Sequence, residues 1–107
     1  MSKIFLSVVI PSYDEMANLQ KGVLDKVEHY LSKKKYVYEI IIVDDGSTDG
    51  SVEFVRNFIE DNKKFRLIEN LHLGKAGTVI KGVLSSQGQY ILFSDMDQAT
   101  PIEEVDK

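Results

Sequence analysis

Residues 36–50 read YVYEIIIVDDGSTDG, and this stretch decides the fold. Its first part contains three isoleucines and two valines with little polar alternation, which is typical of a strand buried on both faces. The second part is small, acidic or hydroxyl-bearing, which favours a turn leading into a helix. We therefore expect a strand at 36–43 and a helix from about Gly50 to Asp61, capped by Ser47, Thr48 or Asp49.

The rest of the chain alternates in the same way between short apolar runs and helical spacing. Strands are expected at 4–10, closed by Pro11, at 65–68 on an edge of the sheet, and at 90–94. Helices are expected over 75–86 and at 102–105. The first strand is followed by one amphipathic helix whose apolar face consists of Leu19, Val23, Val27, Tyr30 and Leu31. The order βαβαβαβ predicts one α/β domain, residues 1–107, with a Rossmann-like, mostly parallel sheet and helices on both faces.

Composition and charge narrow the function classes. The chain has 43% hydrophobic and 28% charged residues and no cysteine, so disulfides and thiolate metal sites are excluded. Its apolar runs fall far short of the ~20 residues that span a bilayer. With 13 basic and 17 acidic residues, the net charge is −4, which argues against nucleic acid as a partner. An anionic ligand must then be held by local groups such as a metal, a helix N-terminus or a lysine.

The residues suited to chemistry follow the expected strands rather than precede them. Ligands of open parallel sheets bind outside the carboxyl ends of the strands, where the strand order reverses. The segments at these ends are 11–15, 44–47, 70–77 and 94–97, and they hold carboxylates, small residues and a lysine. The turns at the opposite edge carry no such cluster. This asymmetry predicts the position of the functional site.

Two acidic pairs stand out. Asp95 and Asp97 lie two residues apart after a strand, and two carboxylates there suit Mg²⁺ or Mn²⁺; the alternative is a solvated acidic turn that caps the next helix. Asp44 and Asp45 could accept hydrogen bonds from a ribose or a base. Their alternative role is turn formation, and both roles can hold together.

Lys75 lies between Gly74 and Gly77 at the start of an expected helix. The helix dipole and backbone N–H groups favour an anion there, although simple surface exposure is the alternative. The segment matches neither a dinucleotide-binding nor a P-loop motif. Tyr13 could stack on a base or pack against the first helix, and His29 and His72 have no metal-ligand spacing.

Segments 8–15, 41–50, 70–77 and 90–97, taken in register, resemble the family 2 glycosyltransferases. Among these, the chain is most similar to dolichyl- and polyprenyl-phosphate sugar transferases, and the resemblance covers essentially all of it. It implies the N-terminal, donor-binding half of a GT-A fold. It also implies a UDP- or GDP-hexose donor, inversion at the anomeric carbon, and a polyprenyl or dolichyl phosphate as one candidate acceptor.

The resemblance also implies roles for individual residues. It assigns a nucleoside pocket, a diphosphate contact and a metal site, with Mg²⁺ or Mn²⁺ as cofactor. The implied nucleotide-sugar site consists of Pro11, Tyr13, Glu15, Asp44, Asp45, Gly46, Lys75 and Asp95, and the implied metal ligands are Asp95 and Asp97. Asp14 departs from the family, which commonly has asparagine at this position, and we expect it to adjust the charge of the pocket.

Family members continue beyond this length with an acceptor-binding portion that supplies the catalytic base. No residue here is assigned as that base, so we expect donor binding without appreciable sugar transfer. We expect the protein to lie in the cytoplasm and to associate with the cytoplasmic face of a membrane only through further regions. Self-association is left open. The alternatives are a phosphorylation-switch receiver and a non-catalytic nucleotide-binding domain. Receivers place the acidic pair after the first strand and the lysine late, whereas Asp44-Asp45 follow the second strand and Lys75 precedes Asp95.

Overall fold

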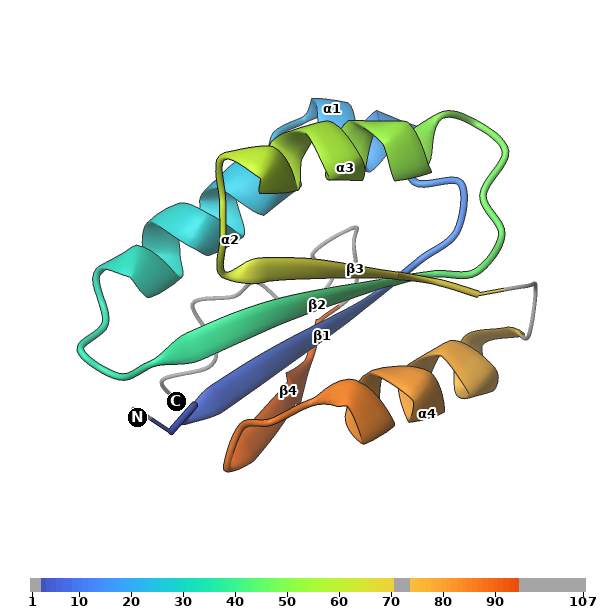
Figure 1. Cartoon of the computed structure of the whole chain (residues 1–107). Coiled ribbons are helices and arrows are strands. Elements are labelled where there is room, and N and C mark those ends of the chain that lie inside the picture. The colour runs from blue at the N-terminus through green and yellow to red at the C-terminus, as the bar shows by residue number, and fades with distance from the viewer. Residues whose placement is uncertain (1–2, 71–73, 95–107) are drawn as a thin grey trace.

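A computed structural model describes residues 3–70 and 74–94, and for Lys75 and Ala76 the backbone only. Its strands form a parallel sheet in the order β3-β2-β1-β4 (Figure 1). The strands are β1 (Leu6–Ser12), β2 (Tyr38–Asp44), β3 (Phe65–Glu69) and β4 (Tyr90–Phe93), and the helices are α1 (Met16–Gln20), α2 (Val23–Ser32), α3 (Ser51–Glu60) and α4 (Gly74–Ser85). Helices α1, α2 and α3 cover one face and α4 the other (Figure 1). The expected α/β class is confirmed, as is the edge position of the strand that begins at Phe65.

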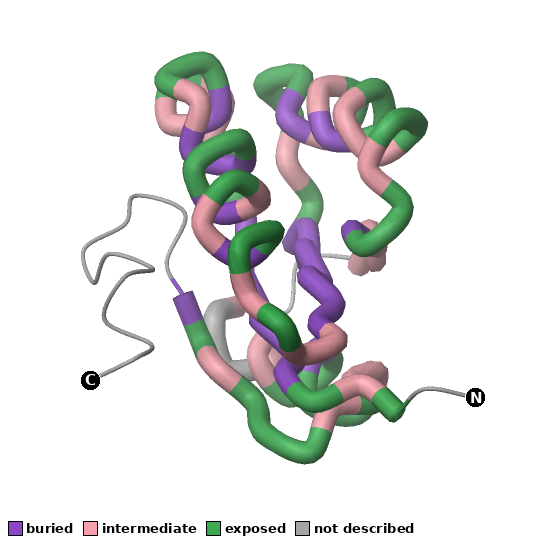
Figure 2. Tube along the Cα trace, turned by 90° about the vertical axis from the view of Figure 1, so that its left-hand side faces the viewer, coloured by how far each residue is buried: buried purple, intermediate pink, exposed green. Residues whose placement is uncertain are grey.

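The sheet has a core on each face because side chains alternate along every strand. Every residue of β2 is buried, and buried positions gather along the strands and the inner sides of the helices (Figure 2). Even-numbered residues such as Val8 and Ile40 pack with Leu19, Val27 and Leu31 in the larger core beneath α1–α3. The odd-numbered residues Val9, Ile41 and Val43 form the smaller core on the α4 side.

Helix α4 approaches the sheet through small residues. Thr78 is 1% exposed, and a Cβ added at Gly82 would lie 2.3 Å from the Val9 Cγ1 atom. The large apolar residues Ile80 and Leu84 point outward, with 58% and 79% of their surface exposed. Apolar spacing predicted the helix, but its sheet-facing side is set by close backbone approach.

Two expectations about boundaries are wrong. The single first helix is divided into α1 and α2, because Gly22 between them has a left-handed backbone with φ of 83°. Pro11 lies within β1, opposite Val43, instead of closing the strand. Val9 accepts a hydrogen bond from the Ser94 N–H, so odd-numbered residues of β1 direct their backbone groups toward β4. Pro11 lies past the last paired residue of β4, where no ladder bond requires an N–H.

The sheet order locates the point of reversal. The chain moves from β1 through β2 to β3 and then returns to place β4 on the other side of β1. Receivers have the strand order 2-1-3-4-5, in which the third strand pairs with the first. Here β3 pairs with β2, which excludes the receiver alternative. The expected helix at 102–105 lies outside the described residues.

Candidate functional site

The loop after β1 is joined to the loop after β2 at Asp14. The Asp14 N–H donates to Ser47 Oγ at 2.8 Å, and the Thr48 N–H donates back to Asp14 Oδ1 at 2.8 Å. Asp14 has a left-handed backbone with φ of 51°, a conformation that a short polar side chain tolerates. Asparagine offers the same oxygen and the same tolerance, so the departure from the family pattern preserves the local geometry and adds a charge.

A second set of bonds joins these loops at Asp49 and Ser51. Asp49 accepts the N–H groups of Met16 and Ser51, each at 3.0 Å, and also the Ser51 hydroxyl. The fully buried Ser51 in turn accepts the Glu15 N–H at 3.1 Å. Although desolvation opposes it, the hydrogen bonds from Ser51 and Met16 hold the pKa of Asp49 below its ordinary value. The N-cap residue of α3 is Gly50, and not Ser47, Thr48 or Asp49 as expected. Asp49, one residue earlier, nevertheless accepts the N–H of Ser51, the first residue of the helix. We refer to the bonded segments 14–16 and 47–51 as the loop clamp.

Asp44 forms the turn that follows β2. It is 2% exposed, and its Oδ2 atom accepts the N–H groups of Gly46 at 3.1 Å and Ser47 at 2.9 Å. Its Oδ1 atom accepts the Ser47 hydroxyl at 2.5 Å. The turn-forming alternative for Asp44 is therefore realised, and contact with a ligand stays a prediction.

Asp45 connects three elements at the carboxyl edge of the sheet. Its N–H donates to the Ser12 carbonyl at the end of β1, and its Oδ2 atom accepts the Gly74 N–H at 2.9 Å. Gly74 is the first residue of α4 and precedes Lys75. The expected meeting of the segments after β1, β2 and β3 is thus observed. Because Asp45 already binds the first N–H of α4, an anion at this helix start must use other groups.

The residues expected to line a nucleoside pocket differ in exposure. Pro11 is half-buried, whereas Tyr13 is 50% exposed. Glu15 accepts a hydrogen bond from the Asn18 amide at 3.4 Å, and Gly46 has a positive φ of 87° in the turn. An aromatic ring that is half open to solvent at this edge has surface to offer a flat ligand.

The expected metal ligands and most of the expected lysine fall outside the part of the chain that the structure describes. Asp95 and Asp97 lie outside the described residues, as does the side chain of Lys75. The chain is held up to Ser94, whose N–H donates to the Val9 carbonyl at 3.0 Å, and Asp95 follows by one peptide bond. Within 3–70 and 74–94, no three histidine, aspartate or glutamate side chains gather as a metal site. The metal site stays a prediction from sequence.

Two buried polar atoms at this edge were not anticipated. Ser12 Oγ and Asn70 Nδ2 have no hydrogen-bond partner among the described residues, and Ser12 is 2% exposed. The Asn70 N–H donates to the Asp44 carbonyl at 2.8 Å, which places it beside the turn. The sequence signal was limited to polar residues near the ends of strands, since Ser12 ends β1 and Asn70 follows β3.

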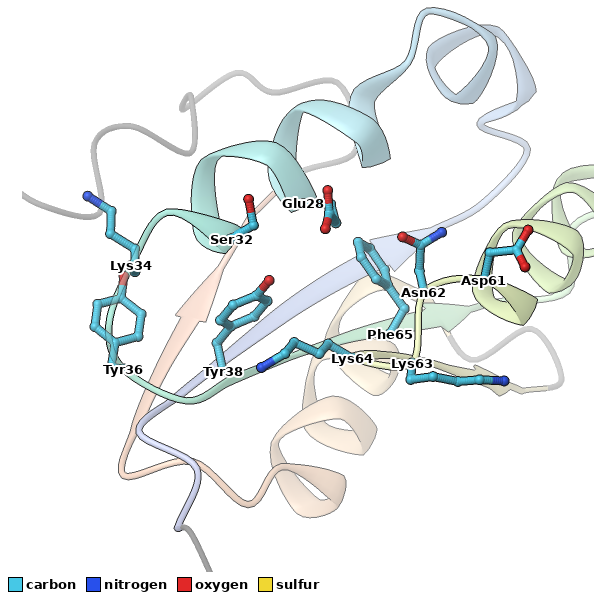
Figure 3. Close-up of a pocket in the computed structure, with 10 residues that line it drawn as sticks. All are labelled: Glu28, Ser32, Lys34, Tyr36, Tyr38, Asp61, Asn62, Lys63, Lys64 and Phe65. Atoms are coloured by element: carbon cyan, nitrogen blue, oxygen red, sulfur yellow. The ribbon is translucent and has the colours of Figure 1, made fainter.

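Two shallow hollows lie at the opposite, amino edge of the sheet. The larger, of 390 Å³, lies between α2 and the start of β3, with Tyr38 and Phe65 directed toward the helix (Figure 3). Desolvation and the nearby Glu28 raise the pKa of Tyr38. The smaller, of 320 Å³, adjoins it near Lys64. None of the expected site residues lines either hollow.

Comparison with known proteins identifies the family. Residues 7–107 match glycosyl transferase family 2. A dolichyl-phosphate beta-glucosyltransferase of Dictyostelium discoideum is 36% identical over all of this chain and 35% of its own length. The enzyme of the same name from Saccharomyces cerevisiae is 38% identical over 98% of this chain and 33% of its own length.

Solved structures agree in fold. A mannosyltransferase from Pyrobaculum calidifontis, in complex with GDP-Man and Mn²⁺, superposes with a TM-score of 0.73 at 24% identity, over 91% of this chain and 28% of that one. S. aureus TarS 1-349 in complex with UDP gives 0.60 at 22% identity, over 88% of this chain and 28% of that one.

The chain therefore belongs to glycosyl transferase family 2, and its fold is that of the GT-A glycosyltransferases. It spans about a third of the length of the curated relatives it matches.

Proposed function

We propose that this chain forms the donor-binding part of an inverting, metal-dependent glycosyltransferase. The donor is a UDP- or GDP-hexose, and the acceptor is a polyprenyl or dolichyl phosphate. The proposal is carried by the family match over 7–107, which includes every segment joined at the carboxyl edge of the sheet. The relatives' name, dolichyl-phosphate beta-glucosyltransferase, supports the acceptor class and a β-linked product. The GDP-Man and UDP bound to the solved neighbours support the donor class.

The loop clamp supplies a pre-organised nucleoside site. Because hydrogen bonds hold the loops after β1 and β2 together, little conformational entropy is lost when a ligand binds between them. Pro11, Tyr13 and Glu15 contribute one wall, with the Tyr13 ring against the base. Asp44 and Gly46 contribute the other wall, in which free acceptor capacity of the Asp44 carboxylate serves the base or ribose.

The diphosphate and the cation are assigned to the remaining loops. The acidic pair assigned to the cation is Asp95 with Asp97, two residues apart in the sequence directly after β4. Two carboxylates fit Mg²⁺ or Mn²⁺, which complete their coordination with water and phosphate oxygens. When bound, such an ion stabilises the charge that develops on the departing nucleoside diphosphate. Lys75 places a further positive charge near the diphosphate, beside the start of α4, and Asp45 fixes that start.

A lipid-phosphate acceptor places the proposed reaction at a membrane, with the donor site on the cytoplasmic side. Across the helices described here, none is long and apolar enough to cross a bilayer.

Calorimetry with UDP and GDP, with and without Mn²⁺, tests the proposal. We expect Mn²⁺ to tighten binding of one of these nucleotides at least tenfold, equivalent to ~1.4 kcal/mol. Asp97→Ala should remove this gain. Asp61→Ala, which removes the same charge at the exposed end of α3, should leave it intact. Absence of Mn²⁺-dependent binding of either nucleotide would refute the proposal.

A further inference from the structure

A carboxylate is buried on the α4 side of the sheet, remote from the donor loops. Glu39, the second residue of β2, is 5% exposed. Burying an ionised carboxylate is costly unless hydrogen bonds and an opposite charge compensate it. Here Ser7 Oγ donates to Oε2 at 2.6 Å, and Arg66 donates to Oε1 through Nη2 at 2.8 Å and Nε at 3.2 Å. Both carboxylate oxygens are therefore in use.

The same groups bind the connection between α4 and β4. Glu39 Oε2 accepts the Gln87 N–H at 2.7 Å, and Ser7 Oγ accepts the Gly88 N–H at 2.8 Å. Arg66 Nη2 donates to the Ser85 carbonyl, at the end of α4, at 2.7 Å. Side chains from β1, β2 and β3 thus each bind one point of a four-residue segment.

Close packing of the turn against β1 adds to these hydrogen bonds. A Cβ added at Gly88 would lie 2.6 Å from both the N and Oγ atoms of Ser7, so the turn rests directly on β1. Strand β4 has limited side-chain packing: Tyr90, Ile91 and Phe93 are 61%, 38% and 48% exposed, while Leu92 packs against the larger core and the Tyr90 ring contacts that of Phe5. Its path is therefore set mainly by its backbone pairing with β1 and by the turn that precedes it.

We propose that Glu39 is a positioning residue which, through Ser7 and Arg66, fixes the 85–88 turn and thereby the path of β4, the strand that Asp95 and Asp97 follow in the sequence. The positioning of metal ligands rests on the proposed function, whereas the attachment of the turn does not. A buried ionic group contributes little net stability compared with well-packed apolar residues, but it specifies one register. Glu39 also has no role in the loop clamp, so disturbing it should affect the metal-dependent part of donor binding selectively.

Glu39→Gln tests the proposal because glutamine offers one acceptor oxygen where the network uses two. We expect hydrogen exchange at the Gln87 and Gly88 amides to accelerate about tenfold or more, with the β1 and β2 amides unchanged. We expect the affinity for UDP or GDP without metal to stay within twofold. The additional affinity conferred by Mn²⁺ should fall at least fivefold.

Arg66→Met should act in the same direction. Arg56→Met is the matched control, because Arg56 also pairs with a glutamate, Glu69, but makes no described contact with the turn. If Glu39→Gln does not fold, Gly88→Ala disturbs the same turn without altering a buried charge.

Unchanged amide exchange would overturn the attachment of the turn. Faster exchange with the Mn²⁺ gain intact, or an equal loss of metal-free affinity, would overturn the positioning role. If the chain without substitutions bound neither nucleotide nor Mn²⁺, the proposed function would fail, and the metal-positioning role with it. The amide exchange data would still decide whether Glu39 attaches the turn.

Discussion

Replacing Gly82 by alanine should force α4 away from the sheet. The new Cβ would lie 2.3 Å from Val9 Cγ1 and 3.3 Å from Val43 Cγ2. The shorter distance is at least ~1 Å below an ordinary carbon–carbon contact. Val9 is fully buried and β-branched, so it has little freedom to rotate away. Overpacking of this kind lowers the free energy of unfolding by about 1–3 kcal/mol. The higher helix propensity of alanine relative to glycine raises it by about 1 kcal/mol. The expected net loss is about 1 kcal/mol.

A double-mutant cycle isolates the clash. Val9→Ala removes the Cγ1 atom, so in that background Gly82→Ala should stabilise the protein by up to about 1 kcal/mol through helix propensity. Urea unfolding followed by far-UV circular dichroism gives each free energy of unfolding, provided that the m-values agree. The reasoning predicts opposite signs for Gly82→Ala in the two backgrounds. The same sign and size in both would show that α4 does not approach the sheet at Gly82.

Three further outcomes are expected. Asp49→Ala should lower the free energy of unfolding by about 1–2 kcal/mol, as for lost helix caps, and weaken nucleotide binding by loosening the loop clamp; urea titration and calorimetry measure the two effects. Asp14→Asn should change stability by less than about 0.5 kcal/mol, whereas Asp14→Val should cost about 1–3 kcal/mol because a β-branched residue is strained at positive φ; thermal melts of both compare them. Although desolvation opposes it, hydrogen bonds from Ser7, Gln87 and Arg66 hold the pKa of Glu39 below 4.5. The stability contributed by this ionised carboxylate should therefore be present above pH 4.5 and be lost as the pH falls below it, and Glu39→Gln should flatten that part of the pH profile.

Much of the fold could be predicted because its determinants are local. The run 36–43 is apolar enough to require burial on both faces, and the acidic turn after it favours a helix start. Every expected element within the described residues is present, with ends displaced by a few residues. The exceptions, the break at Gly22 and Pro11 inside β1, depend on a left-handed residue and on where β4 stops pairing.

The candidate site could be predicted as a location but not as a set of bonds. Placing acidic and small residues after strands requires only their order along the chain, which is why the meeting of the 11–15, 44–47 and 70–77 segments was foreseen. The partners of each carboxylate were not. Asp45 binds an N–H 29 residues away, at Gly74, and Asp14 pairs with the loop at Ser47 and Thr48.

By itself, the sequence determined the parallel α/β class, the edge of the sheet at which the candidate site residues gather, and the resemblance to the family. Only the tertiary structure decided which polar groups satisfy one another, as Glu39 with Arg66 shows. Hydrophobic periodicity reports how deeply a segment is buried, which each segment encodes locally. The partner of a buried charge depends on strand order and register, which bring together residues distant in sequence and so cannot be inferred from either residue's neighbours in the chain.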